Sequence, residues 1–150
     1  VFQLITALQK YSPEFLSLLT FLVCSFSILA FLRWFGAAGL YAYNALAVVA
    51  ANIQVLKMSE FSLYSEPVAL GTVVFATTFL VSDILTEHYG PSAARQALWL
   101  SFLTQILMSV WMVLTLGHTP PDYSKLAPDL AATLAANEQG MLHLFAPSLR

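Results

Sequence analysis

The sequence is poor in charged residues, which make up only 9% of its 150 positions. Soluble proteins carry roughly 25%, whereas 59% of this chain is hydrophobic. This composition excludes an ordinary soluble domain and favours a protein that lies in a lipid bilayer. An excess of positive charge is also missing, because six Lys and Arg stand against eight Asp and Glu. Without a basic surface to neutralise phosphates, nucleic acid is excluded as a partner.

The sequence also lacks the residues of most catalytic and metal sites. Its single cysteine, Cys24, lies in an apolar run and has no second cysteine to pair with. No nucleophile motif, glycine-rich phosphate loop or zinc motif occurs. The carboxylates near His88 have no further ligands at metal-binding spacing. We therefore expect no enzymatic activity, no cofactor and no metal.

Long stretches without charge are what the sequence does contain, and a membrane-spanning helix needs about 20 mostly apolar residues. Three stretches predict spans, at about 15–32, 34–56 and 96–117. A fourth span is predicted over 67–89, because Pro67 suits a first helical turn and Gly90 with Pro91 ends a helix. The expected fold class is therefore all-α, a polytopic helical membrane protein with about four transmembrane helices in a single transmembrane domain.

The last part of the chain, 118–150, has no apolar run long enough to span a membrane. We expect it to be an aqueous or interfacial segment. Within it, 129–139 predicts a short amphipathic helix that ends at Gly140, and 141–145 predicts no more than a short anchor.

Two carboxylates, Asp83 and Glu87, fall inside the fourth predicted span. An ionisable side chain at the centre of a bilayer costs about 2.5 to 3.5 kcal/mol on insertion scales. The last turns of a helix also carry partial negative charge already. The i, i+4 spacing places both carboxylates on one helix face, which Thr72, Ala76 and Phe79 continue.

A positive group should compensate these carboxylates. Candidates are Lys57, Arg95, His88 or a bound substrate or ion. One interpretation is a substrate or ion site, because intramembrane ionisable groups are functional by default. The other is that the carboxylates mark the membrane surface and pair with Arg95. The residues alone leave both interpretations open.

The second predicted span carries the polar residues Asn44, Asn52, Gln54 and Lys57. At about 100° per residue, Gln54 and Lys57 lie on the far side of the helix from Asn52. They cannot all face one partner. Each amide either contacts a substrate or forms an interhelical hydrogen bond, worth about 0.6 kcal/mol. For Gln105, in the last span, we expect helix association.

Several motifs between positions 51 and 102 resemble those of one family. They read ANIQVLK at 51–57, GTVVF at 71–75, SDILTEHYG at 82–90, then Ala94-Arg95 and Trp99. This pattern resembles the queuosine precursor transporter family, a vitamin uptake transporter-like group of integral membrane proteins. The resemblance covers about a third of the chain. Its central motif is fairly specific, because Asp, Thr, Glu, Tyr and Gly must all fall at the right spacing.

The resemblance implies import of deazaguanine precursors of the tRNA base queuosine across the cytoplasmic (inner) membrane of a bacterium. The partners would then be a small deazaguanine and the lipid bilayer. The family pattern is matched, residue by residue, at Asn52, Lys57, Phe75, Asp83, Thr86, Glu87, Tyr89, Gly90, Arg95 and Trp99.

A deazaguanine presents N–H donors, a carbonyl acceptor and a flat face. We interpret Asp83 or Glu87 as readers of the donor edge and Asn52, Gln54 and Lys57 as readers of the acceptors, with Phe75, Phe79 or Trp99 as a stacking wall. We expect one site, between the second and third spans, around which access alternates. The candidate substrate-binding residues are Asn52, Gln54, Lys57, Thr72, Phe75, Phe79, Asp83, Thr86, Glu87, Arg95 and Trp99.

Two departures from the family pattern bear on the fold. Many members carry Pro directly after the Phe, where Ala76 stands here, so no helix break is required at that point. Members usually have about six spans, so we expect the chain to be incomplete and a fifth span to begin at 142–150; a homo-oligomer is the alternative.

The alternative function is a non-catalytic scaffold subunit of a larger membrane complex, whose polar residues serve helix association alone.

Overall fold

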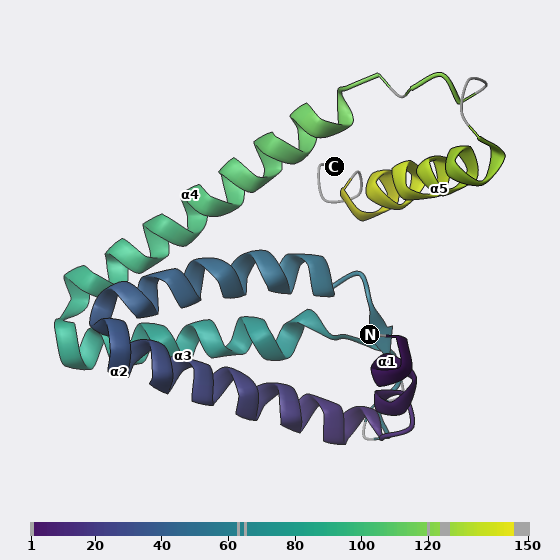
Figure 1. Ribbon diagram of the computed structural model, residues 1–150. Helices are drawn as coiled ribbons and strands as arrows, with labels where there is room; N and C mark the ends of the chain where they lie inside the picture. Colours follow the sequence, from purple (N-terminus) through teal and green to yellow (C-terminus); the bar gives the residue numbers. More distant parts are fainter. Residues whose placement is uncertain (1, 63, 65, 120, 124–126, 146–150) are drawn as a thin grey trace. The chain divides into compact units, whose positions relative to one another are not determined.

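The computed structural model describes residues 2–62, 64, 66–119, 121–123 and 127–145 (Figure 1). It contains two compact units, 1–105 and 106–150, which are described separately. In chain order the elements are α1 (Phe2–Leu8), α2 (Pro13–Gln54), β1 (Met58–Ser59), β2 (Val68–Ala69), α3 (Gly71–Tyr89), α4 (Pro91–Leu116) and α5 (Pro128–Phe145). The predicted all-α class is confirmed. Two of the described helices, α2 and α4, are long and apolar enough to cross a membrane.

Helix α2 is a hairpin of two helical arms, residues 13–35 and 37–54, and Figure 1 shows the second arm running back beside the first. Gly36 separates them with φ 59° and ψ −138°, a conformation that only glycine adopts without strain. The first two predicted spans lie in these two arms. Their boundary was predicted at Arg33, but the left-handed backbone at Gly36, rather than the charge, sets the turn.

Helix α3 begins at Gly71, four residues later than predicted. The predicted start at Pro67 is wrong because Val68 and Ala69 pair with β1 instead, and the Leu70 N–H then donates to the Lys57 carbonyl at 3.0 Å. Gly71 also allows close contact with α2, since a Cβ there would lie 2.3 Å from the Ala51 carbonyl oxygen.

The predicted end of α3 is confirmed. The helix runs through Ala76 without a break and stops at Tyr89, where Gly90 takes φ 88° as the C-cap. Helix α4 then begins directly at Pro91, earlier than the predicted 96, because proline suits the first helical turn.

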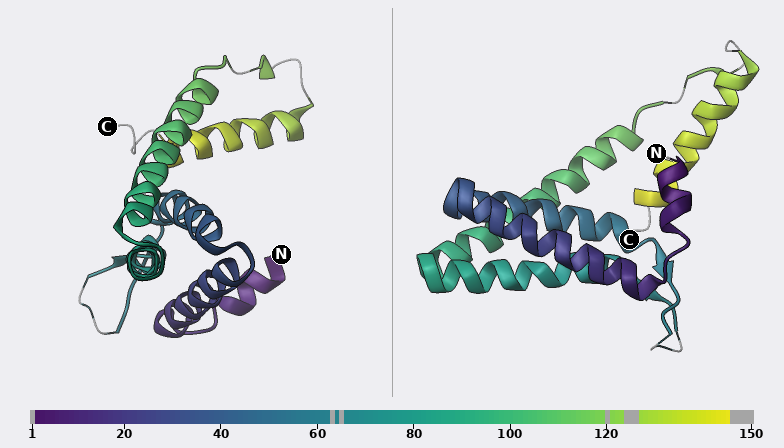
Figure 2. Two further views of the ribbon diagram at one scale, coloured as in Figure 1. Left: turned by 90° about the vertical axis from the view of Figure 1, so that its left-hand side faces the viewer. Right: turned by 60° about the horizontal axis from the view of Figure 1, so that its bottom comes forward.

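The core of unit 1 lies where α3 packs on both arms of α2. Its fully buried side chains include Ile28 and Leu40 of α2 and Val81 and Leu85 of α3. Small residues of α4, such as Ala97, complete the core. The two views in Figure 2 show α3 beside both arms of α2.

Hydrogen bonds between side chains attach α4 to the second arm of α2. The Tyr41 hydroxyl donates to the Gln96 side-chain oxygen at 3.2 Å. Further along, the Asn44 amide donates to the Ser101 hydroxyl at 2.8 Å. The Asn52 amide donates to the Gln105 side-chain oxygen at 3.2 Å. Because both members of the pairs come in the same order along the chain, α4 up to Gln105 runs in the same direction as the second arm.

In unit 2, helix α5 extends beyond its predicted end. The prediction placed the end at Gly140, but the helix continues to Phe145. Glycine inside a helix costs only about 1 kcal/mol relative to alanine, and the following residues continue the helix. The Tyr123 hydroxyl donates to the Glu138 carboxylate of α5. Of the predicted entrance to a fifth span, 146–150 lie outside the described residues.

Candidate functional site

Helix α3 has two faces of different character. The face that packs in the core consists of Gly71, Val74, Thr77, Thr78, Val81 and Leu85. The exposed residues Thr72, Phe75, Phe79, Asp83, Thr86 and Glu87 line the opposite side and are called the motif face here. At about 100° per residue, these six positions fall within about 120° of helix circumference. The structure therefore brings together the predicted residues of α3, but on the side away from α2.

The motif face combines aromatic rings with acidic groups. The rings of Phe75 and Phe79 meet edge to face, with centroids 5.7 Å apart and planes at 89°. Phe79 is 63% exposed. Asp83 follows one turn later on the same face, and Glu87 one turn after that. An exposed aromatic pair next to two carboxylates is suited to a flat ligand that carries hydrogen-bond donors.

Neither carboxylate of the motif face is compensated by a cation in the described part of the chain. The ion pair with Arg95, one of the two interpretations left open by the sequence, is not present among the described residues, and neither Asp83 nor Glu87 bonds to Lys57. Both side chains are exposed. Two uncompensated carboxylates at the end of a helix are unfavourable both for the helix dipole and in a membrane.

The two threonines of the motif face already use their hydroxyl protons. Thr72 donates to the Ala69 carbonyl at 2.8 Å, and Thr86 donates to the Ser82 carbonyl at 2.8 Å. Each hydroxyl oxygen can still accept a hydrogen bond. Both threonines therefore offer an acceptor rather than a donor to a ligand.

The polar residues at the end of α2 lie far from Asp83. The Lys57 backbone carbonyl accepts a hydrogen bond from the Leu70 N–H, just before the start of α3. At the other end of the bundle, a Cβ placed on Gly36 would lie 3.3 Å from the Tyr89 hydroxyl. Asp83 lies twelve residues after Gly71, the first residue of α3, which is about 18 Å along the helix. The structure therefore does not bring Gln54 and Lys57 together with Asp83 and Glu87, which were predicted to form one site.

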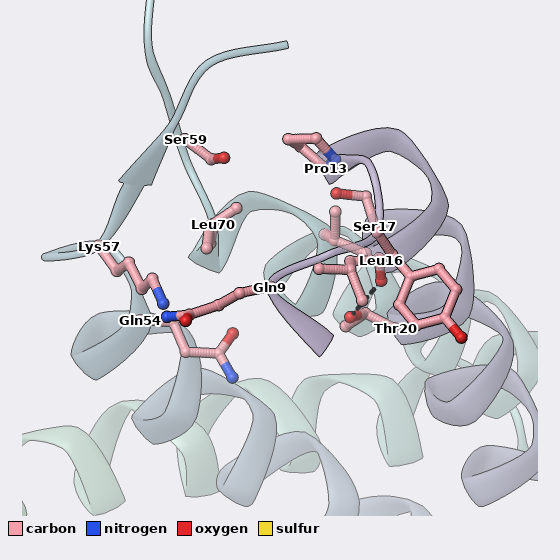
Figure 3. Close-up of a pocket in the computed structure, with 11 residues that line it drawn as sticks. Gln9, Pro13, Leu16, Ser17, Thr20, Gln54, Lys57, Ser59 and Leu70 are labelled. Carbon is pink, nitrogen blue, oxygen red and sulfur yellow. Dashed lines mark hydrogen bonds between the residues drawn. The ribbon is translucent and has the colours of Figure 1, made fainter. Parts of the chain in front are cut away.

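The three residues at this end of α2 also differ from one another. The Asn52 side-chain amide donates hydrogen bonds to the Gln105 side-chain oxygen at 3.2 Å and to the Val48 carbonyl at 2.9 Å. Gln54 and Lys57 instead line a pocket of about 510 Å³ (Figure 3). Asn52 thus joins helices, whereas Gln54 and Lys57 face a cavity.

Two further predicted residues, Arg95 and Trp99, lie one turn apart on α4 and are both exposed. The Trp99 ring meets the Phe102 ring edge to face, with centroids 6.0 Å apart. The core-facing residues of α4 are Ala93, Ala97 and Ser101, so Arg95 and Trp99 occupy another face of the helix.

Sequence reasoning missed several residues that the structure brings to the pocket. Gln9, Ser17, Thr20 and Ser59 line it together with Gln54 and Lys57. Gln9 precedes α2 and Ser59 follows it, and only the reversal at Gly36 brings both ends of α2 together. No spacing rule along the sequence contains that information.

Comparisons with known proteins identify the family of the chain. The family model described as "Putative vitamin uptake transporter" matches residues 69–149, more than half of the sequence. The "Probable queuosine precursor transporter" of Bacillus subtilis (strain 168) is 38% identical over 102 residues, which is 67% of this chain and 44% of that relative. The chain thus spans less than half the length of this relative. No solved structure matches it. By the extent of the family match, the chain belongs to the vitamin uptake transporter family.

Proposed function

We propose that the chain is part of an importer of deazaguanine precursors of queuosine in the cytoplasmic membrane of a bacterium. Its membership of a transporter family and its apolar helices support a membrane location. In this proposal the two arms of α2, together with α3 and α4, are four spans of one transmembrane domain. Helix α5 then lies in water or at the membrane interface. The activity is transport and not catalysis.

The motif face of α3 carries this proposal. A deazaguanine has a ring N–H and an amino group side by side, and a carboxylate accepts both as a pair of hydrogen bonds. Asp83 and Glu87 are exposed carboxylates without an ion pair in the described chain. Phe79, one turn away from Asp83, is available for stacking on the flat ring. Donor-edge recognition and ring stacking are thus possible on one helix face.

The motif face needs a second wall to enclose a ligand. In transporters of this kind, substrate sites lie between groups of helices that move relative to one another. We propose that further helices of a longer protein, or a second copy of the chain, supply that wall. Asp83 and Glu87 would then face a cavity instead of lipid, which removes the cost of exposing them to a bilayer.

The alternative, a scaffold subunit, is favoured only by the contacts between α2 and α4. The amides of Asn44 and Asn52 serve helix association there. None of those bonds involves the motif face. A scaffold role therefore accounts for the α4 contacts and leaves Asp83 and Glu87 unexplained.

The test is the queuosine content of tRNA in cells that cannot synthesise the precursor and receive 7-deazaguanine derivatives at low concentration. We expect the native chain to restore queuosine and Asp83→Asn to fail, although the variant reaches the membrane at the same level. Glu60→Gln, which removes an exposed carboxylate outside the motif face, is the matched control and should restore queuosine. Restoration by Asp83→Asn at the native level would contradict the assignment of Asp83, and no restoration by the native chain, either alone or within a longer protein that supplies the second wall, would contradict the proposed function.

A further inference from the structure

The pocket that contains Lys57, called the Lys57 pocket here, lies at the end of the bundle opposite Asp83. It is an open pocket lined by the segment after α1, the first turns of α2, the residues that follow α2 and the start of α3. Its volume of about 510 Å³ falls within the 300 to 1,000 Å³ that is typical of small-molecule sites. Figure 3 shows Gln9, Gln54 and Lys57 on one side of the pocket, with Ser17 and Thr20 on the other.

The polar lining of the pocket is rich in donors. Among the described residues that line it, none carries a carboxylate and Lys57 is the only charged residue. Within the described chain, the Lys57 ammonium group forms no ion pair. Gln9 and Gln54 add two amide groups beside it, and each amide supplies two N–H donors. A lone cation flanked by amides favours a ligand that presents acceptors: a carbonyl, a ring nitrogen or an anionic group.

The remaining walls of the pocket are apolar and suit a flat ring. They are formed by Tyr11, Pro13, Leu16, Leu70 and Val73. An apolar pocket with a few polar groups that converge on one side is the usual form of a small-molecule site. In such a site the polar groups set the orientation of the ligand, and the apolar walls contact its faces.

This pocket and the motif face have complementary chemistry and cannot hold one molecule together. Asp83 and Glu87 accept hydrogen bonds, whereas Lys57 only donates them. Val73, which lines the pocket, is ten residues from Asp83, about 15 Å along α3. A bicyclic base is much shorter than that. The two groups of residues are therefore separate places of contact.

We propose that the Lys57 pocket is a second binding site for the transported heterocycle, in which Lys57 and its neighbouring glutamines bind the carbonyl side of the ring. This inference rests on the proposed function, because it takes the substrate to be a planar base with a carbonyl group. The motif face would bind the donor edge of the same kind of molecule at the other end of α3. The substrate thus changes the edge by which it is held as it passes along the protein.

A reporter thiol inside the pocket tests this assignment. In a chain with Cys24→Ala, Ser17→Cys places the only thiol in the pocket lining, and its rate of alkylation is measured with the purified full chain in lipid nanodiscs. The probes are 7-deazaguanine and 2-amino-7-deazapurine, which has the same rings and amino group but no carbonyl. Thr133→Cys, exposed on α5, reports any general change in reactivity. Binding of radiolabelled 7-deazaguanine is measured in parallel by equilibrium dialysis.

We expect 7-deazaguanine to protect Ser17→Cys but not Thr133→Cys. The probe without a carbonyl should need about a tenfold higher concentration, because a hydrogen bond to a charged donor is lost. Lys57→Met should remove this difference between the probes, and Lys57→Arg should keep part of it. If Lys57 had only a structural role, its substitution would weaken protection by both probes equally. The difference between the two probes would then stay the same.

Different results would overturn the second site, the role of Lys57 and the proposed function. If 7-deazaguanine binds by dialysis but does not protect Ser17→Cys, the second site is overturned and the proposed function stands. Equal protection by both probes, or a difference that persists in Lys57→Met, overturns the role of Lys57. If 7-deazaguanine does not bind to the folded chain at all, the proposed function is overturned and the second site with it.

Discussion

The Asn44 amide nitrogen lies 2.8 Å from the Ser101 hydroxyl oxygen and joins α2 to α4 inside the core. Asn44 is only 4% exposed, and its side-chain oxygen has no hydrogen-bond partner among the described residues. Within this part of the chain, its bond to Ser101 is thus the interaction that compensates for burying the amide. Bonds of this type fix which helices are neighbours, because alternative packings would leave the amide with no partner at all.

Ser101→Ala should therefore destabilise the chain by about 1 kcal/mol, because it leaves the Asn44 amide without a partner. The measurement is the Tm of the purified protein in detergent. Ser92→Ala, at an exposed position at the start of α4, is the control and should leave the Tm unchanged. An equal Tm for the two variants would mean that the buried bond contributes nothing to stability.

Gly71→Ala should destabilise the contact between α2 and α3. The added Cβ would lie 2.3 Å from the Ala51 carbonyl oxygen, so one backbone must move. Overpacking of this kind costs about 1 to 3 kcal/mol. The same substitution at Gly140, where nothing lies within 4 Å of the new Cβ, should not lower the Tm. If Gly71→Ala unfolds no earlier than Gly140→Ala, the close approach of the two helices is wrong.

Phe79→Ala should weaken uptake through a higher apparent KM. Stacking of a base on an aromatic side chain is worth about 1 to 3 kcal/mol, or about 5- to 150-fold in affinity. Uptake of radiolabelled 7-deazaguanine in cells is the measurement. Leu46→Ala removes a side chain of equal exposure, 63%, from α2 and should keep the native KM. A native KM in Phe79→Ala would remove this ring from the site.

Tyr123 should titrate at a higher pH than an ordinary tyrosine. Its hydroxyl donates to the Glu138 carboxylate, and this hydrogen bond raises the pKa of Tyr123 above 10 because ionisation would break it and place two negative charges side by side. The bond therefore contributes stability below pH 10 that is lost as the pH rises through the raised pKa. NMR of ¹³C-labelled tyrosine measures the titration, with Tyr123→Phe to assign the signal. Glu138→Gln should bring the pKa down; an unchanged pKa would show that the bond is absent in solution.

The fold could be predicted from the sequence where one strong local signal acts. Gly90 followed by Pro91 marked the end of α3 correctly. The start of α3 was wrong because pairing between β1 and β2 takes Val68 and Ala69 out of the helix. That pairing joins residues about ten positions apart and outweighs the helix-start preference of Pro67.

The motif face was predictable and the pocket was not, for one physical reason. The spacing of Thr72, Phe79, Asp83 and Glu87 follows the period of a single helix, so the sequence alone places them together. The Lys57 pocket instead depends on contacts between the two ends of α2. Such contacts depend on which faces pack against each other, and periodicity does not encode that choice.

The turn at Gly36 has a consequence for how the chain reaches its membrane. A single residue connects the two arms of α2, so no loop separates them. In the proposed four-span arrangement, the two arms would therefore enter the bilayer together as one hairpin. Biogenesis would then insert residues 13–54 as one unit.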